Sequence, residues 1–198
     1  MTEKATEIVE EKLGEPVEET TLKGPSFEGM LTRELILADD SDVTRELYDK
    51  TRYGEPQDSK KFHYSLLEGL YLLERGKLKI IDLKGKEIPK DTFVKKALKI
   101  EPNFMIRYAV FRDLRRRGYI VKTALKFGAD FRVYERGVKP GEEHAKWIVF
   151  PVSESETLTW FEFSAKNRVA HSTRKRLLLA IVDSEGDCVF YEIRWVRP

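Results

Sequence analysis

The sequence predicts an α+β domain at the N-terminus, followed by an α/β domain in which helices cover a short mixed sheet. Two observations support this fold class. Apolar residues recur at helical spacing in residues 65–75 and 104–117. Runs rich in β-branched and aromatic residues, which are typical of strands, fall at residues 147–150, 177–182 and 189–195. Such a succession of helices and strands is typical of a sheet with helices packed on it.

The predicted boundary between the two domains is the stretch Glu101, Pro102 and Asn103. Before the first domain lies an acidic segment with seven glutamates against three lysines, in which Pro16 disfavours one long helix. We therefore expect three parts: a mobile or weakly helical lead-in at 1–25, an N-terminal α+β domain at 26–100 and a C-terminal α/β domain at 101–198.

The elements of the N-terminal domain follow from local patterns. Asp42 is expected to cap a short helix, and Gly76 to end the amphipathic helix before it. The predicted elements are a strand at 31–37, a turn at 39–42, helices at 43–50, 65–75 and 92–98, a strand at 78–81 and a turn at 82–86.

The C-terminal domain is expected to begin with a helix capped by Asn103 and ended by Gly118. A second helix would pack through one apolar side, formed by Leu158, Phe161, Ala165 and Val169. The predicted elements are helices at 104–117 and 156–170, strands at 119–122, 127–133, 144–152, 177–182 and 189–195, and a turn at 183–187.

Composition excludes several classes of protein. The 198 residues suit one large or two small domains, and a hydrophobic content of 41% is enough for a core. Cys188 is the only cysteine, so no intrachain disulfide or cysteine-based zinc site can form. The N-terminus lacks a signal peptide pattern, and the longest apolar run, 177–182, is far shorter than the ~20 residues of a membrane span. We expect a soluble, cytoplasmic protein.

Charge is unevenly distributed although the net charge is only +2. Residues 104–137 contain nine lysines and arginines against three acidic residues. Such a segment can follow a phosphate backbone. A solvated helix face is an equally good interpretation of this pattern.

Three polar side chains stand at the ends of predicted strands. Tyr134 follows a strand, His144 opens the next one, and Lys175 leads into a third. Together these residue types can cleave RNA, because its 2′-hydroxyl supplies the nucleophile. The protein must then supply a base, an acid for the leaving 5′-oxygen and a cation for the phosphorane. Histidine suits the acid and lysine the cation, whereas tyrosine, with an ordinary pKa of about 10, is a less usual base.

Each of these three residues is more often structural, so the trio alone is a weak signal. Other catalytic classes lack their motifs: the sequence has no Walker-type loop, no dinucleotide fingerprint and no cluster with metal-ligand spacing. We expect neither a cofactor nor a metal.

Around these residues the chain resembles the archaeal tRNA-splicing endonuclease family, also called tRNA-intron endonuclease. The similarity runs from about residue 52 to 198. Its motifs are YAVFRDL at 108–114, RGYIVKT at 117–123, KFGADFRVY at 126–134, HAK at 144–146 and RVAHSTRK at 168–175.

The resemblance implies a metal-independent cleavage that leaves a 2′,3′-cyclic phosphate and a 5′-hydroxyl. Tyr134 would be the general base, His144 the general acid and Lys175 the stabiliser of the transition state. Arg168 and Trp195 would sandwich a bulged base of the substrate, precursor tRNA folded into a bulge-helix-bulge. A buried core position is the alternative interpretation of Trp195.

The resemblance also implies an assembly of four units, because two bulges require two active sites at a fixed separation. The closing strand would pair with its twin across a two-fold axis. An acidic loop containing Asp183, Glu185 and Asp187 would enter a basic groove of an opposing subunit. The units could be four copies of this chain, or two copies with two of a non-catalytic partner. The rival functions are a non-catalytic RNA-binding subunit of that assembly and a DNA nuclease of related fold.

Overall fold

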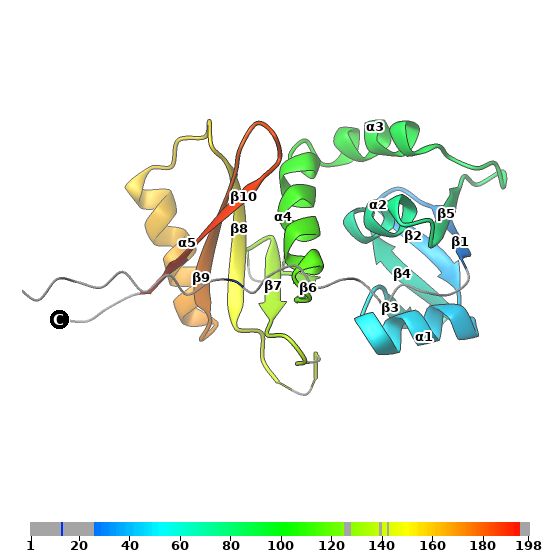
Figure 1. Cartoon of the computed structure of the whole chain (residues 1–198), viewed down its shortest axis with the longest axis horizontal. Helices are drawn as coiled ribbons and strands as arrows, with labels where there is room; N and C mark the ends of the chain where they lie inside the picture. Colours follow the sequence, from blue (N-terminus) through cyan, green and yellow to red (C-terminus); the bar gives the residue numbers. More distant parts are fainter. Residues whose placement is uncertain (1–12, 14–25, 125–127, 139, 142, 195–198) are drawn as a thin grey trace, which may run out of the picture.

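The computed structural model describes residues 13, 26–124, 128–138, 140–141 and 143–194. These residues form two five-stranded mixed sheets, each packed with helices. The two sheets lie side by side, and helix α4 (Phe104–Arg116) lies between them (Figure 1). The helix-covered mixed sheet expected in the C-terminal half is confirmed, and the N-terminal half has an α/β architecture of its own. Apart from Leu13, the predicted lead-in at 1–25 lies outside the described residues.

The N-terminal sheet has the strand order β3-β4-β2-β1-β5. Only the β1–β5 pair is parallel; the other pairs are antiparallel. Its elements are β1 (Phe27–Leu31), β2 (Leu35–Asp39), α1 (Asp42–Thr51), β3 (Glu55–Gln57), β4 (Lys61–Ser65), α2 (Leu66–Glu74), β5 (Leu78–Ile81) and α3 (Lys90–Ile100).

Helix α2 is the centre of the N-terminal core. Ser65 and Glu68 form a capping box at its start, so the orphan amide groups of the first turn are satisfied. Gly69 faces β2 so closely that a Cβ atom there would come within 2.1 Å of Cδ1 of Ile36. A side chain at position 69 would therefore require Ile36 to change its rotamer or the helix to shift.

Three details of the N-terminal prediction are wrong. The expected strand at 31–37 is a hairpin, because the polar residues Thr32 to Glu34 turn the chain and the Thr32 amide bonds to the Leu35 carbonyl at 2.8 Å. Ser41, not Asp42, caps α1, since its hydroxyl accepts from the Thr44 amide. The hairpin of β3 and β4 was not predicted at all.

The C-terminal sheet has the strand order β10-β9-β8-β7-β6, and only the β8–β9 pair is parallel. After α4 come β6 (Ile120–Thr123), β7 (Phe131–Tyr134), β8 (Trp147–Ser153), α5 (Trp160–Ser172), β9 (Arg176–Val182) and β10 (Cys188–Ile193). Helices α4 and α5 lie on opposite sides of this sheet (Figure 1). A buried cluster that includes Ile148, Phe150, Ala170 and Leu177 joins α5 to β8 and β9.

Two details of the C-terminal helices also differ from the prediction. Asn103 occupies the N-cap position of α4, but its side chain makes no capping hydrogen bond. Helix α5 begins at Trp160 rather than 156, because Thr159 and Glu162 form a capping box there. Phe161 therefore falls on the outer side of the helix, where it is 75% exposed, instead of in the packed face.

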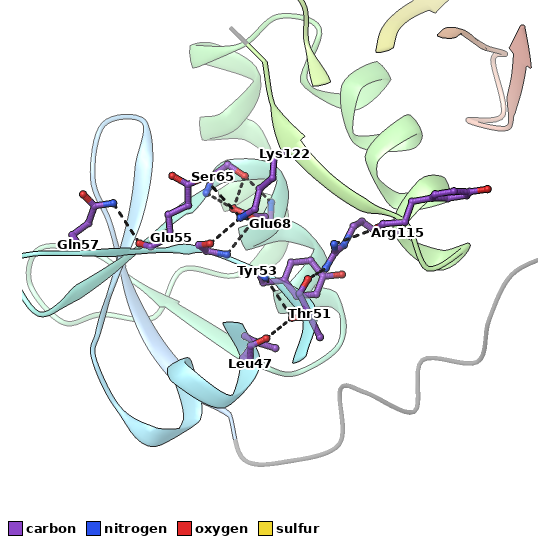
Figure 2. A network of polar contacts seen from close by, with 11 residues as sticks. Leu47, Thr51, Tyr53, Glu55, Gln57, Ser65, Glu68, Arg115 and Lys122 are labelled. Carbon is purple, nitrogen blue, oxygen red and sulfur yellow. Dashed lines mark hydrogen bonds and ion pairs between the residues drawn. The ribbon is translucent and has the colours of Figure 1, made fainter. Parts of the chain in front are cut away.

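The two domains are joined by buried polar contacts rather than by apolar packing alone. Arg115 donates to the Thr51 carbonyl at 2.7 Å, and its guanidinium lies 3.7 Å from the centre of the Tyr53 ring. Lys122 donates to the Gly54 carbonyl at 2.8 Å and lies 3.6 Å from the Glu68 carboxylate (Figure 2). Since β6 carries Lys122, the N-terminal domain braces one edge of the C-terminal sheet.

None of the helices in the described residues has the length and apolar character needed to cross a bilayer.

Candidate active site

The three predicted catalytic residues come from segments that meet at one end of the inner strands of the C-terminal sheet. This end of the sheet is called the catalytic edge below. Because β7 runs antiparallel to β8, and β9 runs parallel to β8, the end of β7 lies beside the starts of β8 and β9. The Lys146 amide donates to the Val133 carbonyl at 2.9 Å, and the Arg176 amide donates to the Lys146 carbonyl at 3.0 Å. These two bonds tie the three chain segments together immediately next to Tyr134, His144 and Lys175.

Tyr134 is the last residue of β7 and is 5% exposed. Its register partner is Ile120 of β6. Side chains alternate along a strand, so Tyr134 lies on the opposite face from Val133, which is buried in the core cluster that contains α4 residues. The ring therefore belongs to the α5 side of the sheet.

His144 is exposed and lies in the loop between β7 and β8. Strand β8 starts at Trp147, so the prediction that His144 opens this strand is wrong by three residues. The loop is held on both sides of the histidine: Pro140 and Glu143 form a β-bridge before it, and Ala145 is buried directly after it. The exposed imidazole of His144 is accessible to a large substrate.

Lys175 is held by the C-terminal end of α5. The Arg174 amide donates to the His171 carbonyl at 3.0 Å and the Lys175 amide to the Ala170 carbonyl at 2.9 Å, which is a Schellman motif. Arg174 has the left-handed backbone, φ 56°, that this motif requires. The Lys175 ammonium donates to the Thr173 carbonyl at 2.9 Å. Two effects lower the pKa of Lys175: partial burial, which is the larger, and the charge of Arg132.

A second polar cluster lies at the same end of the sheet, and the sequence did not predict it. The Glu192 carboxylate accepts from Nε1 of Trp147 at 2.8 Å and pairs with Arg176 at 3.1 Å. Burial raises the pKa of Glu192, but hydrogen bonds from Trp147 and Arg194 outweigh it and hold the pKa below its ordinary value. The cluster fastens β10 to β8 and β9, and only the fold could bring residues 45 positions apart together.

Of the predicted base-stacking pair, Arg168 lies among the described residues. Arg168 is exposed on α5, and its guanidinium carbon lies 5.9 Å from the centre of the Phe161 ring. Trp195 lies outside the described residues. Arg168 therefore has one aromatic neighbour from its own helix.

The acidic loop between β9 and β10 is organised by one of its own carboxylates. Oδ1 of Asp183 accepts from the amides of Glu185 and Asp187, each at 2.9 Å. Arg112 of α4 donates to the Gly186 carbonyl at 3.3 Å and holds the loop against the domain. Glu185 and Asp187 are exposed, so these two carboxylates are the ones presented to solvent.

Two cavities in the described part of the chain lie away from the candidate catalytic residues. A cavity of about 480 Å³ lies between the domains, and another of about 360 Å³ lies on the Trp147 side of the C-terminal sheet. Tyr134, His144 and Lys175 line neither of these cavities. In the described part of the chain, no group of three histidine, cysteine or acidic residues could hold a metal ion.

Two family models match this chain, one to each half. Residues 104–195 match the catalytic C-terminal domain of tRNA intron endonuclease, and residues 27–94 match the N-terminal domain of the same enzyme. The fold and site thus define an RNA endonuclease domain with a separate N-terminal domain. The chain belongs to the tRNA-splicing endonuclease family.

Individual relatives agree with this assignment along most of the chain. The tRNA-splicing endonuclease of Methanothermobacter thermautotrophicus is 41% identical over 171 residues, which are 86% of this chain and 98% of the relative. The enzyme of Nanoarchaeum equitans is 48% identical over 139 residues, 67% of this chain and 88% of the relative. The enzyme of Thermococcus onnurineus is 43% identical over 152 residues, which are 77% of this chain and 86% of the relative.

Proposed function

We propose that this enzyme excises introns from precursor tRNA at bulge-helix-bulge sites, without a metal, and leaves 2′,3′-cyclic phosphate and 5′-hydroxyl ends. The observation that supports the proposal is that the segments carrying Tyr134, His144 and Lys175 come together at one end of the sheet, in a chain of this family. A bulge-helix-bulge is recognised by its shape, because bulged nucleotides are unstacked and accessible.

Each of the three residues has one role in the reaction. Tyr134 accepts the proton of the 2′-hydroxyl as that oxygen attacks the neighbouring phosphorus. The bond to the 5′-oxygen breaks, and His144 protonates this leaving group. Lys175 stabilises the negative charge that collects on the non-bridging oxygens of the phosphorane. The exposure of His144 and the anchored backbone of Lys175 support these roles.

The recognition of RNA is assigned to Arg168 and Trp195, which would enclose one bulged base between a guanidinium and an indole. Arg168 is exposed on α5, which leads directly to Lys175. A base held at this helix would place the adjoining phosphate near the catalytic edge.

The proposed assembly has four units, formed by four copies of this chain or by two copies with two of a non-catalytic partner. Strand β10 is the outer strand of its sheet and exposes Val189 and Tyr191, which are 56% and 57% exposed. Pairing with a second β10 would cover this edge. The exposed Glu185 and Asp187 of the acidic loop would enter a basic groove of another unit.

We assign the boundary between the two domains to residues 100 and 101, and the enzyme to the cytoplasm. Helix α3 ends at Ile100 and α4 begins at Phe104, which leaves a short connection at this position.

The experiment incubates the purified chain with an intron-containing precursor tRNA in excess EDTA, with His144→Ala as the matched variant. We expect cleavage at both bulges, cyclic phosphate ends, and a loss of about 10²- to 10⁴-fold in rate for the variant, as for removal of a general acid. Binding without cleavage would favour a non-catalytic RNA-binding subunit, and cleavage that EDTA abolishes would favour a metal-dependent nuclease.

A further inference from the structure

Arg132 is a second cation on the catalytic face of the sheet. It lies in β7 two residues before Tyr134, so the two side chains leave the strand on the same face. Its register partner in β8 is Ile148, which is buried in the cluster under α5. Arg132 is half-buried, so its side chain runs between the sheet and the α5 layer.

The guanidinium of Arg132 lacks an acceptor within the described residues. Its Nε atom is shielded from solvent and has no hydrogen-bond partner there. The Nε atoms of Arg52 and Arg115 also lack a hydrogen bond, but each of these guanidinium groups has another polar partner. Nε of Arg107 lies 2.9 Å from the Asp130 carboxylate. Arg132 has neither an ion pair nor a hydrogen bond among the described residues.

A buried Nε–H group without an acceptor costs free energy, because its desolvation is not offset by a new hydrogen bond. The cost is increased by Lys175, whose pKa is lowered by burial and by the charge of Arg132. Two cations that repel each other on one face create a site of positive potential. An anion bound between them would offset both costs.

We propose that Arg132 binds a non-bridging oxygen of the phosphate that is cleaved at this edge. The inference rests on the proposed function, which places that phosphate beside Tyr134 and Lys175. During the attack the non-bridging oxygens gain negative charge, and a guanidinium offers planar, directional donors that an ammonium does not. Arg132 thus fixes the orientation of the phosphorane, and Lys175 acts on it as a point charge.

The test compares Arg132→Met, which keeps an apolar stem, with Arg132→Lys and with the control Arg45→Met. Arg45 is an exposed arginine of α1 that is already paired with Asp40 at 2.7 Å. We expect Arg132→Met to lower the single-turnover cleavage rate by about 100-fold, as for loss of one donor to a developing oxyanion. Arg132→Lys should recover part of the rate, and Arg45→Met should cleave like the wild type.

A phosphorothioate at the cleaved phosphate distinguishes contact from support of the fold. Replacement of the oxygen that Arg132 binds should slow the wild type and Arg45→Met, and slow the Arg132 variants much less. The affinity for an RNA with a 2′-methoxy group at the cleaved nucleotide, which cannot react, should change little, because one phosphate contact is lost among many. If Arg132→Met fails to fold, Arg132→Lys carries the phosphorothioate measurement.

A wild-type rate in Arg132→Met, or an undiminished phosphorothioate effect in the Arg132 variants, would overturn the role of Arg132. His144→Ala in the same series separates this result from a failure of the proposed function. If His144→Ala is inactive while Arg132→Met is fully active, only the inference on Arg132 is wrong. If both variants cleave like the wild type, the proposed catalytic edge itself is wrong.

Discussion

The domain interface and the catalytic edge use the same residue types under opposite electrostatic conditions. At the interface, Lys122 is buried but meets the Gly54 carbonyl and the Glu68 carboxylate. At the catalytic edge, Lys175 donates to a neutral carbonyl, and its pKa is lowered by burial and by the charge of Arg132. The two regions lie on one sheet, so the sheet itself does not determine the difference.

This comparison shows how a structural cation can be distinguished from a functional one. A buried charge whose partners come from the protein stabilises the fold, and removal of either partner leaves the other exposed to a large desolvation cost. A cation whose pKa is lowered by burial and by a neighbouring like charge weakens the fold, and an anionic ligand would relieve that repulsion. Lys122 is more deeply buried than Lys175, yet Lys175 is the lysine that we propose acts on the phosphorane.

Lys175→Met tests the functional side of the comparison and has the largest expected effect. We expect the single-turnover cleavage rate to fall by about 10²- to 10³-fold, because the phosphorane loses its nearest ammonium. The free energy of unfolding in urea should stay the same or rise, since the ammonium is partly desolvated in the folded state. A large loss of stability with little loss of activity would show that Lys175 is structural.

Lys122→Met tests the structural side and should have an intermediate effect. The change leaves the Gly54 carbonyl and the Glu68 carboxylate without their ammonium donor, and we expect the free energy of unfolding to fall by about 3 kcal/mol. The folded variant should still cleave RNA. The control is Lys61→Met, because Lys61 forms an exposed ion pair with Asp39 and its loss should cost less than about 1 kcal/mol. Equal losses in the two variants would contradict the assignment.

Glu192→Gln extends the comparison to the pH dependence of the free energy of unfolding, and it should have the smallest effect of the three substitutions. The folded pKa of Glu192 lies below its ordinary value of 4.5, so its stabilising contribution is fully present above pH 4.5. It is lost as the pH falls through the folded pKa. In urea unfolding at a series of pH values, the wild type should exceed the variant at neutral pH and lose this advantage in acid. An advantage that persists in acid would rule out a carboxylate origin.

Part of this fold could be predicted because local signals agree with the tertiary structure. Helix α2, strand β5 and the turn at 183–187 lie close to their predicted positions, since each has its own caps, apolar pattern or turn residues. The hairpin of β1 and β2 was read as one strand because its turn contains no glycine or proline. The exposed position of Phe161 depends on where the capping box of Thr159 starts the helix.

The candidate site was predictable to a different extent. Tyr134, His144 and Lys175 were chosen from strand ends and a family resemblance, and the register of β7, β8 and β9 brings their segments together. Their catalytic roles stay predictions, as do those of Arg168 and Trp195. Arg132 was not singled out, because an arginine between Phe131 and Val133 looks like an ordinary outward residue of a strand. Its missing acceptor is visible only once the neighbouring segments are in place.

The parallel pairing of β8 and β9 has a consequence for the moment at which the enzyme becomes active during its synthesis. Tyr134 and His144 are joined to Lys175 only after α5 has crossed the sheet and β9 has docked, and β9 precedes the last strand of the chain. Pairing between distant segments is slow compared with local helix formation. A nascent chain therefore contains its whole N-terminal domain well before Lys175 and β9 complete the proposed site, and a chain that ends before Lys175 lacks part of that site.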